Sequence, residues 1–105
     1  MTTTETTAIW YLYILDCDGR AYYTGITTDA DRRTRQHQSG RSPGASATRG
    51  FSRIERVYTV AIGSRSEAQR AEYRLKRLSR EEKGRIVKAQ PTAAQLLHQL
   101  KIAAA

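Results

Sequence analysis

The sequence has a single cysteine, Cys17, among its 105 residues. This excludes an intramolecular disulfide and an all-cysteine metal site, and it favours a reducing compartment such as the cytoplasm. No apolar run approaches the roughly 20 residues of a membrane-spanning helix. The first residues also lack the basic segment and apolar core of a signal peptide, so we expect a cytoplasmic protein that does not bind membranes.

Acidic residues are scarce as well. The chain has 10 Asp and Glu against 18 Lys and Arg, which gives a net charge of +8 and a pI near 10.2. Such an excess favours a polyanionic partner, most often nucleic acid and less often an anionic membrane surface. We therefore expect the protein to bind DNA, or RNA, through the phosphate backbone, and we infer no obligate protein partner.

The order of the residues predicts one α+β domain. Residues 1–8 read as a disordered polar lead-in, residues 9–89 as the domain, and residues 90–105 as an amphipathic helix and tail packed on it. Apolar and aromatic runs predict strands over residues 9–15, 21–26 and 54–62. Capping residues predict helices from Thr28 or Asp29 to about His37, over 64–78, from Ser79 to about Ala89, and after Pro91. The prediction is a three-stranded, mainly antiparallel sheet flanked by helices, with a long loop over residues 38–52.

Two turns are compatible with the link between the first two strands. A two-residue turn at Asp18-Gly19 would send Tyr13 and Tyr23 to opposite faces of the sheet. A three-residue loop, Cys17-Asp18-Gly19, would instead pair Tyr13 with Tyr23 on one face. We expect the second register, because it brings the two phenols together.

Five positions together resemble the GIY-YIG nuclease superfamily, and in particular its small YhbQ-like bacterial branch. Tyr11-Leu12-Tyr13 stands where the family has Gly-Ile-Tyr, and Tyr23-Thr24-Gly25 stands where it has Tyr-Ile-Gly. The three further matching positions lie on the predicted helices and are Arg33, His37 and Glu72. The resemblance covers residues 9–88. The family also places an asparagine after the metal-binding glutamate, but this chain contains no asparagine.

The resemblance implies a catalytic set of Tyr13, Tyr23, Arg33, His37 and Glu72. Tyr13 would act as general base or proton relay, and Tyr23 would order the water or bind a phosphate oxygen. A free tyrosine near pKa ~10 is a poor base, so Arg33 is expected to favour the phenolate and to bind the scissile phosphate. His37 would accept a proton or contact phosphate.

The expected cofactor is one divalent ion, Mg²⁺ or Mn²⁺, held by a single glutamate. Helical periodicity allows either Glu67 or Glu72 as its ligand, and the resemblance selects Glu72. Without the resemblance, Glu72 would be expected only to pair with Lys76 one turn along the helix. Gly25 is expected to let the chain leave its strand towards Arg33.

Segment 32–56 is strongly basic, with seven arginines and the single acid Glu55. Arginine suits bidentate phosphate contacts, and the scattered positions favour backbone contact over base readout. Thr48 and Arg49, in the long loop, are the residues most expected to touch substrate. The full predicted nucleic-acid-binding set is Arg32, Arg35, Arg41, Thr48, Arg49 and Lys76.

The sequence therefore predicts a metal-dependent DNA endonuclease that hydrolyses phosphodiester bonds in single-stranded, branched or damaged DNA, as in DNA repair. One alternative is a nucleic-acid-binding module that keeps the nuclease fold with little or no catalysis, which the missing asparagine favours. Another is a basic adaptor for an acidic protein, which leaves the tyrosines, Arg33 and Glu72 unexplained.

Overall fold

The structure is a computed structural model that describes residues 8–40 and 46–102. Within these residues lie the strands β1 (Trp10–Cys17), β2 (Ala21–Thr27) and β3 (Ile54–Gly63), the helices α1 (Ala30–Ser39), α2 (Arg65–Lys76), α3 (Arg80–Ala89) and α4 (Ala93–Gln99), and one 3-10 turn, η1 (Ser46–Thr48). The predicted α+β class and the order of elements are confirmed. The turn η1 interrupts the predicted loop. The predicted lead-in, except Ala8, lies outside the described residues.

The helices begin where their capping residues predict. Asp29 caps α1 by accepting a hydrogen bond from the Arg32 backbone N–H at 3.1 Å, which decides between the two candidate caps. The capping boxes at the starts of α2 and α3 both form, and α4 starts with a third one. Each box satisfies backbone N–H groups that the first helical turn leaves unpaired. None of the helices in the described ranges has the length and apolar character needed to cross a bilayer.

The sheet is antiparallel, with β1 between β2 and β3. In the observed register Tyr13 lies opposite Gly25 and Leu15 lies opposite Tyr23, so the predicted pairing of Tyr13 with Tyr23 is wrong by two residues. The turn comprises residues 18–20, and both Asp18 (φ 57°) and Gly19 (φ 66°) are left-handed. Because the error is an even number of residues, both tyrosines still lie on one face of the sheet.

The carboxylate of Asp18 holds this turn in place through hydrogen bonds. It accepts hydrogen bonds from the backbone N–H groups of Ser52, at 3.1 Å, and Arg53, at 2.5 Å. These bonds tie the β1–β2 turn to the segment that leads into β3, and they hold the pKa of Asp18 below its usual value. The contact spans more than thirty residues along the chain, so local turn preferences do not reveal it.

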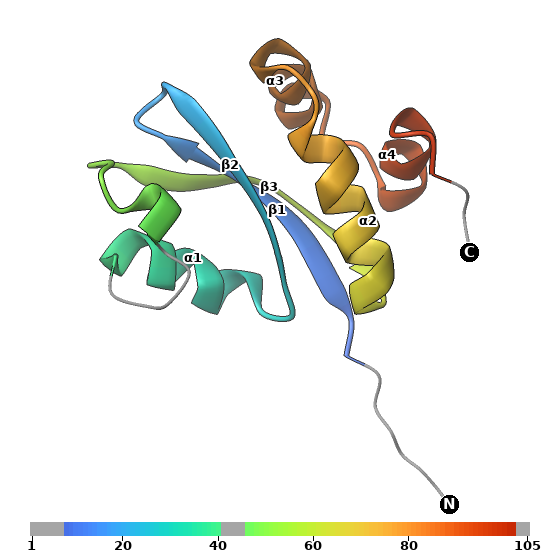
Figure 1. Cartoon of the computed structure of the whole chain (residues 1–105), viewed down its shortest axis with the longest axis horizontal. Helices are drawn as coiled ribbons and strands as arrows, with labels where there is room; N and C mark the ends of the chain where they lie inside the picture. The colour runs from blue at the N-terminus through green and yellow to red at the C-terminus, as the bar shows by residue number, and fades with distance from the viewer. Residues whose placement is uncertain (1–7, 41–45, 103–105) are drawn as a thin grey trace, which may run out of the picture.

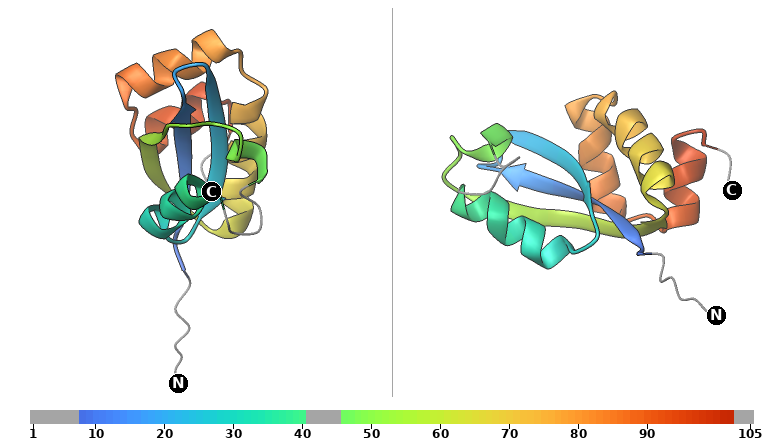
Figure 2. Two further views of the ribbon diagram at one scale, coloured as in Figure 1. Left: turned by 90° about the vertical axis from the view of Figure 1, so that its left-hand side faces the viewer. Right: turned by 60° about the horizontal axis from the view of Figure 1, so that its bottom comes forward.

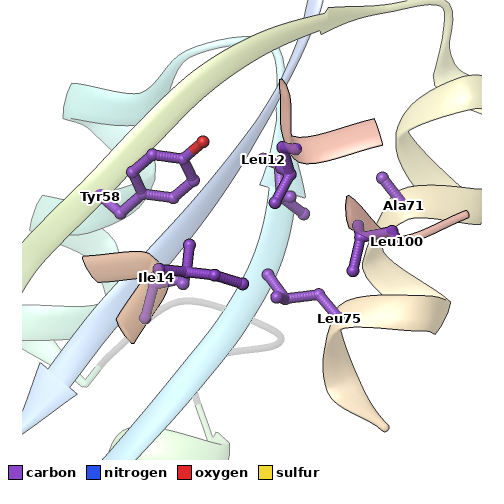
Figure 3. Close-up of a cluster of buried hydrophobic side chains, with 8 residues drawn as sticks. Leu12, Ile14, Tyr58, Ala71, Leu75 and Leu100 are labelled. Carbon is purple, nitrogen blue, oxygen red and sulfur yellow. The ribbon is translucent and has the colours of Figure 1, made fainter. Parts of the chain in front are cut away.

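Helices cover both faces of the sheet (Figures 1 and 2). Leu12 and Ile14 on β1 face α2, α3 and α4 and form a buried cluster with residues of those helices (Figure 3). The cluster includes Leu96 and Leu100, so the C-terminal helix packs into it. Tyr13, Leu15 and Cys17 alternate with these residues and point to the opposite face, where α1 lies.

Helix α1 is fastened to β3 by polar contacts. The side-chain amide of Gln38 donates to the carbonyl of Ile54 at 2.9 Å, and the guanidinium of Arg56 pairs with Asp31 at 2.7 Å. These contacts lie at both ends of α1 and fix the helix against the sheet. The helix therefore presents Arg33 and His37 at a defined position relative to the tyrosines.

Candidate active site

Three aromatic rings meet between the sheet and α1. Tyr13 comes from β1, Tyr23 from β2 and His37 from α1. The ring centres of Tyr23 and His37 are 4.8 Å apart, those of Tyr13 and His37 are 6.0 Å apart, and those of the two tyrosines are 6.3 Å apart. These are packing distances for aromatic rings, so each ring restricts the positions of the other two.

A chain of hydrogen bonds runs through this group. The Tyr13 hydroxyl lies 3.0 Å from Nε2 of His37, and Nδ1 of the same ring lies 2.9 Å from the hydroxyl of Thr48. Only 1% of His37 and none of Thr48 is exposed. The sequence predicts Thr48 at a loop surface in contact with substrate, and this location is wrong, because η1 turns its side chain inward to His37.

Gly25 makes room for the ring of Tyr13. A Cβ atom added at Gly25 would lie 2.6 Å from Cζ of Tyr13 and would collide with the phenolic oxygen. The phenol therefore crosses β2 at the one position of the strand that carries no side chain. Gly25 has no positive φ, so the expectation that it redirects the chain is wrong. In the observed register Gly25 lies opposite Tyr13, so the sequence reveals this role of Gly25 only when the register is known.

Burial keeps Tyr13 and His37 uncharged. It raises the pKa of Tyr13 to about 12, with further increases from the nearby Tyr23 and the negative charge of Glu72. Arg33 acts in the expected opposite direction, through a hydrogen bond and its charge, but burial outweighs it. Burial, together with the charge of Arg33, lowers the pKa of His37 to about 4. At neutral pH a phenol therefore faces a neutral imidazole.

Arg33 and Glu72 approach the tyrosines from different elements. Arg33 lies on α1, where its Nη1 donates to Oε1 of Gln36 at 2.8 Å, and it is close enough to Tyr13 to lower the pKa of the phenol. Glu72 lies on α2, which packs along β2, the edge strand that the phenol of Tyr13 crosses. The effect of Glu72 on the pKa of Tyr13 shows that the two groups are within electrostatic range at this edge.

Of the two glutamates that periodicity allows as a metal ligand, one already has a structural role. Oε1 of Glu67 accepts a hydrogen bond from the backbone N–H of Ser64 at 2.8 Å in the capping box of α2. Glu72 pairs with Lys76 at 3.2 Å, and its side chain remains 22% exposed. Its carboxylate is thus accessible and can exchange an ammonium partner for a metal ion.

A metal ion here would have one protein carboxylate. In the described ranges, no group of three or more His, Cys, Asp or Glu side chains could hold a metal. A single, partly exposed carboxylate suits a hard ion such as Mg²⁺, which keeps several waters and takes further oxygens from phosphate. The donor set therefore fits Mg²⁺ or Mn²⁺ and does not fit a site closed by protein ligands.

Four of the six predicted nucleic-acid-binding residues lie at the surface around α1 and α2. Arg32, Arg35, Arg49 and Lys76 are exposed, whereas Arg41 lies outside the described residues. Nε of Arg49 donates to the carbonyl of Gly40 at 3.0 Å, which holds this arginine at the C-terminal end of α1. These side chains are accessible to a polyanion without rearrangement of the core.

The remaining aromatic and histidine residues separate into surface and packing positions. Tyr11 and Tyr22 are partly buried and His98 is exposed. Tyr73 is 60% exposed, and Arg77 lies over its ring at 5.4 Å. A cavity of about 280 Å³ opens beside Tyr11 and Asp31, and no predicted catalytic residue lines it.

Comparisons with known proteins show which family the chain belongs to. Residues 9–85 match the model of the GIY-YIG catalytic domain. The UPF0213 protein YhbQ of Escherichia coli O127:H6 is 44% identical over 92 residues, which cover 88% of this chain and 90% of that protein. A UPF0213 protein of Pectobacterium carotovorum is 50% identical over 82 residues, which cover 78% of this chain and 81% of that protein.

A solved structure shows the same architecture. The solution NMR structure of the UPF0213 protein BH0048 from Bacillus halodurans is 40% identical, with a TM-score of 0.50, and the match covers 90% of this chain and 99% of that one. The family match extends from the start of β1 into α3, and so it includes both tyrosines, Arg33, His37 and Glu72. The chain therefore belongs to the GIY-YIG family and resembles the UPF0213 proteins over most of their length.

Proposed function

We propose that the protein is a metal-dependent endonuclease that hydrolyses phosphodiester bonds in single-stranded, branched or damaged DNA. The observation that carries this proposal is the convergence of four elements on one phenol. Tyr13 on β1 packs against Tyr23 on β2 and bonds to His37 on α1, and Arg33 on α1 and Glu72 on α2 are within electrostatic range. The GIY-YIG domain is a nuclease-type domain, which supports the same reaction class.

Phosphodiester hydrolysis requires an activated water, a counter-charge for the phosphoryl oxygens and stabilisation of the leaving oxygen. Tyr13 accepts a proton from the attacking water as its own proton passes to Nε2 of His37. The water oxygen bonds to phosphorus while the bond to the leaving oxygen breaks. That oxygen takes a proton from solvent, and the protonated His37 returns one proton to solvent. The neutral state of His37 matters here, because a protonated ring has no free acceptor.

Arg33 supplies a fixed positive charge beside Tyr13. Its fork geometry suits two phosphate oxygens, and its charge near the phenol favours release of the phenolic proton. Tyr23 packs against His37 and has its hydroxyl available to order water or to contact phosphate. The two residues thus take the roles of phosphate clamp and orienting group.

Glu72 would hold the divalent ion, with Lys76 released from its carboxylate. When bound, the ion would supply positive charge that stabilises the phosphoryl transition state. Without the ion, the carboxylate alone would repel a phosphate. We therefore expect cleavage to depend on Mg²⁺ or Mn²⁺.

Substrate binding would depend mainly on phosphate contacts. The chain has a net charge of +8, and Arg32, Arg35, Arg49 and Lys76 are exposed. Contacts to the backbone carry no sequence information, so we expect little base preference and a steep loss of affinity with salt. Flexible or open DNA gives its phosphates easier access to a small site than a rigid duplex does.

The test combines cleavage and binding assays on labelled single-stranded, duplex and forked DNA with Mg²⁺, Mn²⁺ or EDTA. We expect metal-dependent cleavage of at least one substrate, and a loss of 100-fold or more, about the scale of one transition-state contact, in Glu72→Gln, Arg33→Ala and Tyr13→Phe. Glu72→Gln should keep DNA binding. Glu81→Gln is the matched control, because Glu81 also pairs with a basic residue one helical turn along, at 3.3 Å, but on α3.

The absence of asparagine from the chain supports a second candidate function. The family residue that follows the metal glutamate has no counterpart, which favours a binding module with little or no catalysis. Tight binding of every DNA form without cleavage under any metal condition would establish that module and refute the nuclease. Loss of cleavage in Glu81→Gln equal to that in Glu72→Gln would remove the special role of Glu72.

A further inference from the structure

The ring of His37 lies between two hydroxyl groups, those of Tyr13 and Thr48, at 3.0 and 2.9 Å. A hydroxyl group both donates and accepts hydrogen bonds. The two distances are therefore compatible with either neutral tautomer of the ring, one with the proton on Nδ1 and the other with the proton on Nε2. Only the first leaves Nε2 able to accept the proton of Tyr13.

The surroundings of Tyr13 favour this first tautomer. A phenol is more acidic than an aliphatic alcohol and is the stronger donor to an imidazole nitrogen. Arg33 places a positive charge and N–H donors within range of the phenolic oxygen. With the proton on Nε2, that oxygen would face donors from both residues, and its own proton would lose the acceptor on His37. With the proton on Nδ1, the order of donation is consistent from Tyr13 to His37 to Thr48.

We propose that Thr48 is a positioning residue that accepts a hydrogen bond from Nδ1–H of His37 and so keeps Nε2 free to accept the proton of Tyr13. This inference rests on the proposed nuclease function. It assigns Thr48 a role within the protein instead of the contact with substrate that its loop position suggests.

The burial of this contact makes Thr48 hard to replace. His37 is 1% exposed and Thr48 is fully buried, so water has little access to Nδ1 if the hydroxyl is removed. A buried N–H without an acceptor is costly, whereas the other tautomer can donate from Nε2 to the oxygen of Tyr13. Loss of the Thr48 hydroxyl should therefore move the ring proton to Nε2 and block the acceptor.

Variants that keep the packing of Thr48 can distinguish the loss of its hydrogen bond from a general disturbance of the site. His37 also packs against Tyr23, with ring centres 4.8 Å apart, and this contact does not involve Thr48. Valine has nearly the shape of threonine, so Thr48→Val removes the hydroxyl and keeps most of the volume. Thr48→Ser keeps the hydroxyl and removes a methyl group.

The first measurement is a long-range ¹H–¹⁵N NMR spectrum of the purified protein without DNA or metal. The chain has two histidines, and the exposed His98 serves as an internal reference. We expect wild-type His37 to carry its proton on Nδ1, Thr48→Ser to keep that state, and Thr48→Val to move towards Nε2–H. Thr59→Val, at an exposed position of β3, should leave the spectrum of His37 unchanged.

The second measurement is the single-turnover cleavage rate with saturating DNA. General acid–base contributions are typically about 100-fold or more, so we expect a loss of roughly 10- to 100-fold in Thr48→Val with unchanged DNA affinity. Thr48→Ser should stay within about threefold of the wild type. Rescue by serine distinguishes the hydroxyl from the packing of the side chain.

The proposal is overturned if wild-type His37 carries its proton on Nε2, or if Thr48→Val loses activity without a change of tautomer. If Thr48→Val does not fold, the wild-type spectrum and Thr48→Ser still decide the question. Absence of cleavage by the wild type would refute the proposed function and the catalytic part of this inference. The spectrum would then still establish whether Thr48 sets the tautomer.

Discussion

Both faces of the sheet bury side chains, but the two sets of side chains differ in chemistry. On the side of α2, α3 and α4, the buried residues of β1 are Leu12 and Ile14, and their neighbours are almost all aliphatic (Figure 3). On the side of α1, the buried group includes Tyr13, His37 and Thr48, whose polar atoms bond to one another. One strand thus contributes alternate residues to a hydrophobic core and to a second face, on which Tyr13 joins a polar network beside the apolar Leu15 and Cys17.

This difference teaches how a domain of 105 residues can carry both a core and a site. Aliphatic packing is non-directional and tolerates small shifts, whereas a buried hydrogen-bond network depends on the geometry of every partner. The aliphatic face should therefore determine the free energy of unfolding. The polar face should determine activity, and it should respond to changes that barely affect packing.

The largest effect on stability should come from the aliphatic face. Leu75 on α2 is fully buried among Leu12 and Ile14, so Leu75→Ala removes several methylene contacts and leaves a cavity. We expect the free energy of unfolding to fall by about 2–5 kcal/mol. Urea denaturation measures this loss. The cleavage rate per folded molecule and the NMR state of His37 should remain near the wild-type values.

Gly25→Ala is the matching change for the polar face. It adds one methyl group where the ring of Tyr13 lies, so the phenol must move. We expect loss of cleavage with a smaller loss of stability, of the order of 1–3 kcal/mol for an overpacked position. If Leu75→Ala and Gly25→Ala lowered activity and stability in the same proportion, the division of labour between the faces would be wrong.

The next effect is a loss of stability in mild acid that originates on the polar face. The pKa of His37 falls from 6.5 to about 4 in the folded protein, chiefly through burial. Between these values the unfolded chain binds a proton that the folded chain does not, so acid favours unfolding. The free energy of unfolding should fall by about 2–3 kcal/mol from pH 7 to pH 4.5, at 1.36 kcal/mol per pKa unit.

The control is His37→Gln, which has no titrating ring and should flatten this part of the pH profile. The window stops at pH 4.5 because Asp18, Glu67 and Glu82 have lowered pKa values and lose stabilisation as they become protonated in stronger acid. An equal loss of stability in the wild type and His37→Gln would mean that other groups are responsible for the acid sensitivity.

The contrast between the faces also explains what the sequence could predict. The aliphatic face follows from local patterns: the capping boxes set the starts of α2 and α3, and the periodicity of Ala68, Ala71 and Leu75 identifies the buried side of α2. The choice of a three-residue loop gives the shared face of Tyr13 and Tyr23, although the predicted register is wrong by two residues. These signals arise within a few residues of one another.

The polar face depends on contacts between distant parts of the chain. Asp18 binds the backbone of residues 52 and 53, and this contact helps to set the turn that determines the register. His37 bonds to Thr48 across the segment that follows α1. A polar residue in a Gly- and Ser-rich loop has no local feature that marks it as buried, and this is why the sequence predicts a contact between Thr48 and substrate.

The smallest effect concerns a buried polar group on the aliphatic face. Thr24 on β2 pairs with Ile14 and is 3% exposed, and in the described ranges its hydroxyl is the buried side-chain group without a hydrogen-bond partner. Thr24→Val removes the unpaired hydroxyl and keeps the shape, so the free energy of unfolding should rise by about 1 kcal/mol. Thr59→Val, at an exposed position of β3, should change it by less than about 0.5 kcal/mol. A decrease in stability for Thr24→Val would instead show that the hydroxyl has a bound partner such as water, and that both faces of the sheet satisfy their polar groups.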